Sequence, residues 1–431
     1  MLLAFDFRNH LSFRETASLS TLRTGKPKEL DLECSWDERI SPVTVIYGPN
    51  ASGKSNLLGA FGFVRALVTT AHKGEESQPK RFGAPFALDE TSKDTQSEFE
   101  VRFIANYGEM RYEYVYRLIL ARAYIAEESL TVYRSVQPTT LYVRTQEAED
   151  IAPAYWFNRV FAQAERAIIQ KATLPYKPAL AAAPLMDTSP LQGAFEWFSE
   201  NISLYNAAGF ESEHESIKER LHNGDESLRK DLLSYLQEAD LGICSIELNE
   251  IREEDETRMR AALSEANIPE DLIERFLADE RLSLSLGHST AAGIVTLPFG
   301  HESEGTKAML SFGSVASKTL RSGSILVIDE IDTSLHPALV RHLVKRFADP
   351  TLNPKQAQLI ITTHDLGLLT TWPMEDDLLS RDQVWFVEKD RTGASSLYSL
   401  ADFSPRKGDN ILRRYLMGHY GAVPKVGNHE R

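Results

Sequence analysis

Cysteine is scarce in this sequence of 431 residues, and long apolar runs are absent from it. The two cysteines, Cys34 and Cys244, are too few and too far apart for a disulfide framework or a zinc site, and both are interpreted as small, semi-buried apolar side chains. No run approaches the roughly 18 apolar residues of a membrane-spanning helix, and charge enters at Asp6 and Arg8 before a signal-peptide core forms. The sequence therefore predicts a soluble, cytoplasmic protein without redox chemistry.

An excess of positive charge is also missing. The 47 Lys and Arg residues face 62 Asp and Glu residues, so the formal net charge is −15. This balance argues against a wholly basic, sequence-independent coat for nucleic acid and leaves room only for a local basic stripe with weak contacts. The length predicts two or three lobes, and a hydrophobic content of 42% is enough for a buried core. The basic positions considered for such a stripe are Lys80, Arg81, Arg406, Lys407, Arg413 and Arg414.

A glycine-rich loop stands between an apolar strand pattern at 43–47 and a helical pattern that opens at Lys54. Its spacing, G-x-x-x-x-G-K-S, is that of a phosphate-binding loop in the strand–turn–helix context that the motif requires. Loop N–H groups and the helix N-terminus would face the phosphates of ATP, Lys54 would supply a point charge, and the Ser55 hydroxyl would ligate Mg²⁺. The predicted nucleotide-binding residues are Gly48, Pro49, Asn50, Ala51, Ser52, Gly53, Lys54, Ser55 and Asn56.

Two carboxylates follow a second apolar strand pattern, 325–328. They lie at the carboxyl end of that strand, where open α/β sheets bind ligands. With the phosphate loop upstream, Asp329 is predicted to hold Mg²⁺, and Glu330 to orient and deprotonate the attacking water. Gln96, just before the strand pattern that begins at 99, is a candidate third magnesium contact, although a surface glutamine fits the same sequence.

Further segments resemble those of ABC-type and SMC-type ATPase heads. The turn Ser303-Glu304-Gly305-Thr306-Lys307 resembles the signature segment, whose Ser and Gly contact the γ-phosphate held by a second subunit. It departs from the usual Leu-Ser-Gly-Gly-Gln wording at Glu304 and Lys307. The run from Asp332 through Ser334 to Pro337 looks like a D-loop, and His364, at the end of another apolar strand pattern, resembles the histidine switch.

Two more segments carry the resemblance, the internal motif Arg381-Asp382-Gln383 and the final motif from Tyr415 to Pro424. With them, the motifs resemble those of the bacterial RloA/AbiL-type ATPases, relatives of the ATPase part of OLD, PARIS and Septu proteins. The resemblance covers about 1–135 and 283–424 and is weaker between them. It implies an anti-phage defence ATPase that hydrolyses ATP with Mg²⁺ and uses Lys54, Glu330 and His364 in catalysis. It also implies a homodimer or higher homo-oligomer through head-to-tail sites, and a separately encoded effector of nuclease or Toprim type.

The predicted fold class is α/β, an ABC/SMC-type P-loop head with an inserted helical subdomain. The predicted division is 1–135 for the first part of the head, 136–285 for a compact helical lid, and 286–431 for the second part. Prolines at 175, 178, 184 and 190 exclude one continuous helix in the lid.

Two other functions remain open on the sequence alone. One is a RecF/SMC-like repair ATPase that acts on DNA, and the other is a nuclease with a Toprim domain in the same chain. The 67 residues after His364 carry no added acidic metal cluster and argue against the nuclease. A nuclease-like neighbouring reading frame would favour defence over repair.

Overall fold

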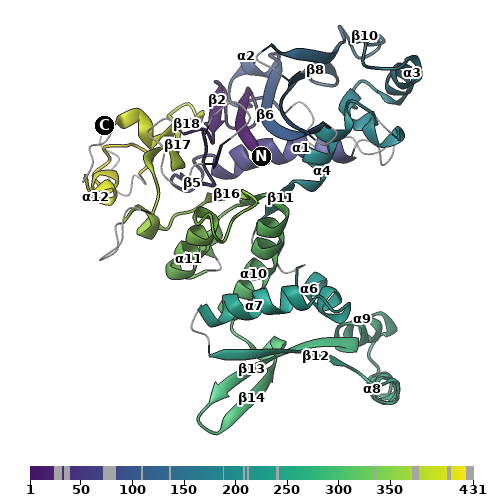
Figure 1. Ribbon diagram of the computed structural model, residues 1–431, viewed down its shortest axis with the longest axis vertical. Helices are drawn as coiled ribbons and strands as arrows, with labels where there is room; N and C mark the ends of the chain where they lie inside the picture. Colours follow the sequence, from purple (N-terminus) through teal and green to yellow (C-terminus); the bar gives the residue numbers. More distant parts are fainter. Residues whose placement is uncertain are drawn as a thin grey trace. The chain divides into compact units, whose positions relative to one another are not determined.

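The computed structural model describes residues 1–23, 32–33, 39–70, 84–107, 110–134, 137–187, 189–206, 209–210, 213–238, 242–333, 335–370, 378–404 and 409–423. They form two compact units (Figure 1). Unit 1 comprises Met1–Leu204, Thr319–Ile331 and Arg341–Arg431, and unit 2 comprises Tyr205–Lys318 and Asp332–Val340. Among the described residues, no helix has both the length and the apolar character needed to cross a bilayer.

A six-stranded sheet carries the motif residues of unit 1. Its strand order is β11-β15-β16-β5-β17-β18, and β15, β16, β5 and β17 run parallel. Every residue of β5, β15 and β16 is buried, which explains the apolar runs at 325–328 and 359–361 in the sequence. The bounds are β5 (Val43–Tyr47), β11 (Ile202–Tyr205), β15 (Ile325–Ile328), β16 (Gln358–Thr362), β17 (Val384–Lys389) and β18 (Ser395–Ser399).

A second sheet of seven strands, in the order β10-β9-β8-β7-β6-β1-β2, is antiparallel throughout. A hairpin joins two of its strands, because Tyr107 at the end of β6 pairs with Met110 at the start of β7. The strands are β1 (Leu2–Arg8), β2 (Ala17–Ser20), β6 (Ser97–Tyr107), β7 (Met110–Leu120), β8 (Ile125–Tyr133), β9 (Thr139–Thr145) and β10 (Ala154–Phe157). A separate two-stranded ladder joins β3 (Leu32–Glu33) and β4 (Arg39–Ile40).

Helix α1 (Lys54–Thr70) lies in the main core of unit 1, which contains apolar residues of both sheets. Phe61 packs edge-on against Phe5 of β1 at 5.3 Å between ring centroids and against Trp197 of α4 (Gln192–Glu200) at 6.4 Å. The predicted class, an α/β P-loop head with an inserted subdomain, is confirmed by this strand–loop–helix unit in a parallel sheet. The remaining elements of unit 1 include α2 (Glu90–Lys93), α3 (Gln163–Ala172) and α12 (Ile411–Leu416).

The structure divides the chain differently from the predicted 136–285 lid. Strands β9 and β10 extend the seven-stranded sheet of unit 1, and α4 packs on α1, so unit 2 begins only at Tyr205. The apolar spacing at 155–171 favours a helix, but Tyr155, Trp156 and Phe157 pair with β9 and belong to β10. Local spacing does not distinguish these pairings from helical patterns, since the pairing partner lies outside the window.

Unit 2 is mixed rather than purely helical. Strands β12 (Ile243–Glu250), β13 (Leu282–Thr290) and β14 (Gly293–Pro298) form an antiparallel sheet (Figure 1). The middle of β13, residues 284–287, is buried. The helices are α6 (Glu213–His222), α7 (Glu226–Glu238), α8 (Glu253–Glu265) and α9 (Glu270–Arg281); α10 (Glu304–Ser322) and α11 (Pro337–Ala348) cross between the units along the chain.

The stretch 173–191, which contains the four prolines, is fixed to the seven-stranded sheet by a buried ionic cluster. The fully buried Glu128 accepts hydrogen bonds from the Tyr142 hydroxyl (2.6 Å) and from the backbone N–H of Ala179 (2.6 Å), at the start of the 3₁₀ helix η2 (Ala179–Leu185). The fully buried Arg144 donates to the carbonyls of Leu174 (2.8 Å) and Lys177 (2.7 Å). Burial, and then the Glu128 charge, raise the pKa of Tyr142 well above its usual value, so its hydroxyl remains a donor.

Candidate nucleotide-binding site

The loop from Gly48 to Gly53 connects β5 to α1 in a conformation that needs both glycines. Gly53 has φ +117°, and a Cβ there would lie 2.4 Å from Ser395 Oγ. A Cβ on Gly48 would lie 2.4 Å from the Val387 carbonyl oxygen. Ala51 also takes a positive φ of 61°. The spacing of the glycines therefore reflects backbone demands of the loop itself.

Hydroxyl groups from distant parts of the chain hold this loop. Ser395 Oγ donates to the Ser52 carbonyl (2.6 Å) and shares a second hydrogen bond with Ser12 Oγ (2.8 Å). Asn56 Nδ2 donates to the same Ser12 Oγ (2.8 Å). The backbone N–H of Ser395 donates to the Ser12 carbonyl (2.7 Å). The loop is thus preorganised by contacts with the β1–β2 connection and with β18.

Lys54 is only 4% exposed and lies over the loop. Its Nζ donates to the carbonyl of Gly48 (2.9 Å), contacts that of Pro49 (3.4 Å), and lies 3.0 Å from His364 Nε2. Because an ammonium group only donates, the nitrogen of His364 that faces it accepts. The structure therefore brings together Lys54 and His364, which are 310 residues apart in the sequence.

Asp329 and Glu330 follow β15 and are fixed by a threonine from the neighbouring strand. Thr362 Oγ1 donates to Asp329 Oδ1 (2.6 Å) and accepts from the backbone N–H of Glu330 (2.7 Å). Glu330 has a left-handed backbone with φ 53°, a strained conformation for this residue type. One hydroxyl thus orients both carboxylate residues at the carboxyl edge of the parallel sheet.

The donor set fits a magnesium-bound nucleoside triphosphate. The hydroxyl oxygen of Ser52 is buried without a hydrogen-bond partner, although it lies within the phosphate loop. The first turn of α1 has no acidic residue, so the partial positive charge of this helix end is not matched locally. Ser55 is exposed, and with Asp329 it offers the oxygen ligands that Mg²⁺ prefers.

No group of three or more His, Cys, Asp or Glu side chains able to hold a metal occurs among the described residues. Gln96 is exposed immediately before β6, and its carbonyl accepts from Asn9 Nδ2 (3.4 Å). Its part in magnesium binding therefore stays a prediction.

The signature residues belong to unit 2, at the beginning of α10. Ser303 Oγ accepts from the backbone N–H of Thr306 (3.1 Å) and lies 2.9 Å from the Thr306 hydroxyl, so it caps the helix. Ser303, Glu304 and Gly305 are exposed and Thr306 is buried. Lys307 Nζ donates to Glu304 Oε1 (2.9 Å). Glu304 and Lys307, the two residues that differ from the usual signature sequence, therefore form an ion pair with each other.

Some of the residues singled out in the sequence lie away from the loop and the carboxylate pair, and others lie outside the described residues. Asp332 is in the short 3₁₀ helix η4 (Ile331–Thr333). Of the basic positions, Arg414 pairs with Asp409, and Arg413 is in the same helix α12. The positions not described are Cys34, Lys80, Arg81, Ser334, Arg406, Lys407 and Pro424.

Three supporting residues were not assigned roles from the sequence. They are Ser12, Thr362 and Ser395, whose partners lie far away along the chain. Thr362 has a usable signal, since it ends a buried strand two residues before His364. Ser12 and Ser395 have no such signal, because a single serine beside a turn is common in protein sequences and does not indicate a role.

Comparisons with solved structures return heads of SMC proteins at low similarity. The SMC head bound to the C-winged helix domain of ScpA has 16% identity and a TM-score of 0.42, over 92% of this chain and 97% of that one. The SMC head domain from Thermotoga maritima has 14% identity and a TM-score of 0.43, over 92% and 98% of the two chains. The SMC head with an extended coiled coil from Pyrococcus furiosus has 14% identity and a TM-score of 0.38, over 92% and 96%. At these scores the likeness adds nothing to the argument from topology and site geometry.

A family profile gives the assignment. No curated protein is significantly similar to this sequence. Residues 43–370, well over half of the chain, match the family described as "AAA domain, putative AbiEii toxin, Type IV TA system". The matched range contains the phosphate loop, the Asp329–Glu330 pair and His364. The chain therefore belongs to this AAA-domain family and has the fold of its P-loop ATPases.

Proposed function

We propose that this protein hydrolyses ATP, and that it serves as sensor and scaffold of an anti-phage defence system whose output comes from a separately encoded effector. The observation that carries the enzymatic part is the convergence of Lys54, His364 and the Asp329–Glu330 pair at one edge of the parallel sheet. The convergence supplies each group that phosphoryl transfer to water needs.

Each residue then has a distinct role. The loop N–H groups and Lys54 bind and orient the β- and γ-phosphates, and they stabilise the charge that develops on transfer. Glu330 accepts the proton of the attacking water, and Thr362 holds the backbone that aims it. His364, which follows strand β16 between β15 and β5, contacts the γ-phosphate. A bound Mg²⁺, held by Ser55 and Asp329, would neutralise phosphate charge.

The first test is Glu330→Gln. It keeps the shape of the side chain and removes the base, so ATP binding should persist while turnover falls by at least about 100-fold. Hydrolysis is followed by phosphate release and binding by calorimetry. Glu90→Gln, at a carboxylate that is 89% exposed, is the matched control and should match the wild type. An unchanged rate in Glu330→Gln contradicts the assignment of the base.

We further propose that two chains meet head to tail, with Ser303, Gly305 and Thr306 of one contacting the nucleotide of the other. The exposure of Ser303 and Gly305 at a helix N-terminus supports this arrangement. Turnover per chain should then rise with protein concentration and level off as dimers form. A rate per chain that is constant over the monomer–dimer range would contradict it.

The defence role rests on the RloA/AbiL-like motifs and on the family description, which names a toxin of a toxin–antitoxin system. Phage plating should be measured in cells that express the chain alone, the product of its neighbouring reading frame alone, or both. Protection is expected only with both, and Lys54→Ala or Glu330→Gln should abolish it while the protein stays folded. Full protection by the chain alone, or nuclease activity without a partner, would refute a separate effector. Tight duplex binding without ATP at physiological salt would instead favour a repair function.

A further inference from the structure

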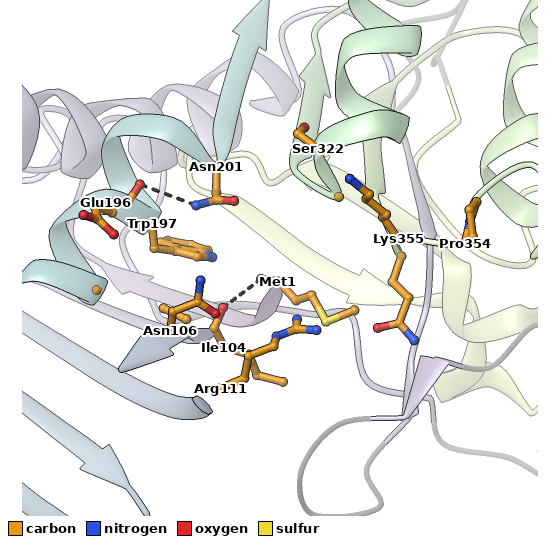
Figure 2. A pocket seen from close by; sticks show the side chains of 14 residues that line it. Met1, Ile104, Asn106, Arg111, Glu196, Trp197, Asn201, Ser322, Pro354 and Lys355 are labelled. Carbon is orange, nitrogen blue, oxygen red and sulfur yellow. Dashed lines mark hydrogen bonds between the residues drawn. The ribbon is translucent and has the colours of Figure 1, made fainter. Parts of the chain in front are cut away.

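A polar pocket of about 500 Å³ lies in unit 1, away from the phosphate loop (Figure 2). Its walls include Ser322 and Gly323, which precede β15, and Lys355 and Gln356, which precede β16. Asp329 follows β15 at its other end. Because β15 and β16 are parallel, the pocket is at the amino edge of the sheet and the nucleotide site is at the carboxyl edge.

Two glycines allow the close backbone approaches that shape this pocket. Gly323, with φ +71°, ends α10, and a Cβ there would lie 2.5 Å from the Lys355 carbonyl. A Cβ on Gly193 of α4 would lie 1.7 Å from the carbonyl of Asn106 at the end of β6. Any side chain at either position would therefore push apart two walls of the pocket.

A buried donor without a partner faces the pocket. Trp197 is 1% exposed, its Nε1 has no hydrogen-bond partner, and Figure 2 shows the indole nitrogen directed into the open space. The ring is fixed by stacking on Phe103 at 4.1 Å between centroids. A buried donor left without an acceptor costs about 1–3 kcal/mol, so an acceptor in the pocket would relieve that cost.

The pocket lining also carries two cationic side chains against one carboxylate, that of Glu196. Arg111 and Lys355 line it, and among the described residues neither has a carboxylate partner within salt-bridge distance. The Met1 amino group donates to the Ile104 carbonyl (2.9 Å), and burial together with the Arg111 charge lowers its pKa to about 4. This amine is therefore uncharged near neutral pH, and the two side chains supply the positive charge.

Acceptors and amides complete the lining. The carboxylate of Glu196 already accepts from Gln192 Nε2 (2.8 Å). The side chains of Asn106 and Asn201 offer both donors and acceptors, and the Asn201 amide makes a long contact with the Glu196 carbonyl (3.5 Å). Amides of this kind suit a polar group such as a sugar or a heterocycle.

We propose that this pocket is a second ligand site, which binds a small organic phosphate. Arg111 and Lys355 bind the phosphate oxygens, Trp197 Nε1 donates to one of them or to a neighbouring acceptor, and the amides contact the organic part. The volume exceeds that of an inorganic anion and lies in the range of small-molecule sites. The proposal is independent of ATP hydrolysis at the opposite edge.

The experiment uses the full chain carrying Lys54→Ala, which disables the phosphate loop as a competing site. Inorganic phosphate and AMP are titrated by calorimetry up to about 10 mM, the range of weak millimolar binding. AMP should saturate at one site per chain and bind more tightly than phosphate. Arg111→Ala and Lys355→Ala should each weaken AMP binding about tenfold, as expected for charge-assisted hydrogen bonds.

Two further variants keep the test decisive. Arg258→Ala removes a 77% exposed arginine of unit 2 and should leave AMP binding unchanged. Trp197→Phe keeps the buried ring, removes the donor, and should weaken binding several-fold; its thermal unfolding reports whether the fold survives. Absence of saturable binding of both probes overturns the proposal, as does binding insensitive to Arg111→Ala and Lys355→Ala. Phosphate that binds as tightly as AMP overturns the assignment to an organic phosphate.

Discussion

Helix α1 of unit 1 and helix α10 of unit 2 both begin with small and polar residues, but their first turns differ in charge and burial. Lys54 is 4% exposed and α1 has no acidic residue in its first turn. At α10, Glu304 is in the first turn, 91% exposed and paired with Lys307. The α1 terminus thus leaves its partial positive charge for an external anion, whereas α10 supplies a carboxylate of its own. We therefore expect strong phosphate binding at α1, and only weaker contacts from α10 with a ligand held elsewhere.

The largest effect is expected at α1 itself. Lys54→Ala removes the buried ammonium that contacts the loop carbonyls and His364, so ATP affinity measured by calorimetry should fall at least about 100-fold. Lys93→Ala, an exposed lysine paired with Glu90, is the matched control. Equal affinities in these two variants would remove the distinction between the helix termini.

The next effect separates binding from turnover at α10. Ser303→Arg places a long cation at the exposed cap and should lower hydrolysis at least about tenfold, while ATP binding to the phosphate loop is unchanged. Ser303→Ala removes the proposed nucleotide contact and the cap to Thr306, worth about 1 kcal/mol of helix stability, but adds no cation, so it should lower hydrolysis less than the arginine variant. If the arginine variant hydrolyses ATP at the wild-type rate, the signature assignment fails.

Two glycines, one at the start of each helix, allow α1 and α10 to be compared by their effect on the free energy of unfolding. Gly53→Ala meets Ser395 Oγ at 2.4 Å and a φ of +117°, so it should lower the free energy of unfolding by about 1–3 kcal/mol. At Gly305 the nearest atom to a new Cβ is Ser303 Oγ at 3.7 Å, and Gly305→Ala should change stability by no more than about 0.5 kcal/mol. Urea unfolding measures both. A Gly53→Ala protein as stable as the wild type would show that the loop adapts.

Elements defined by contiguous residues were predictable from the sequence. The phosphate loop needs a strand, eight residues and a helix, and each part has its own local signal. The apolar runs of β15 and β16 likewise predict buried parallel strands that end in polar residues. For these segments the local sequence is enough to predict the element, although distant hydroxyl groups hold the phosphate loop in place.

Elements defined by distant partners were not predictable in the same way. The hydrogen bond from Thr362 to Asp329 depends on the parallel register of β15 and β16, and that from Ser395 to Ser12 joins residues 383 apart. The register of β10 on β9 was hidden for the same reason. Strand β14 is exposed along its whole length, so it has no burial alternation to reveal it.

The smallest expected effect tests the carboxylate of α10. Glu304→Gln removes a negative charge next to the signature serine, so repulsion from a bound triphosphate falls and the KM for ATP should decrease a few-fold at most. The effect should shrink as salt rises, because the side chain is 91% exposed. Glu304→Asp keeps the charge and should resemble the wild type in steady-state kinetics. A salt-independent change, or one larger than that of Ser303→Arg, would mean that Glu304 contacts the nucleotide directly.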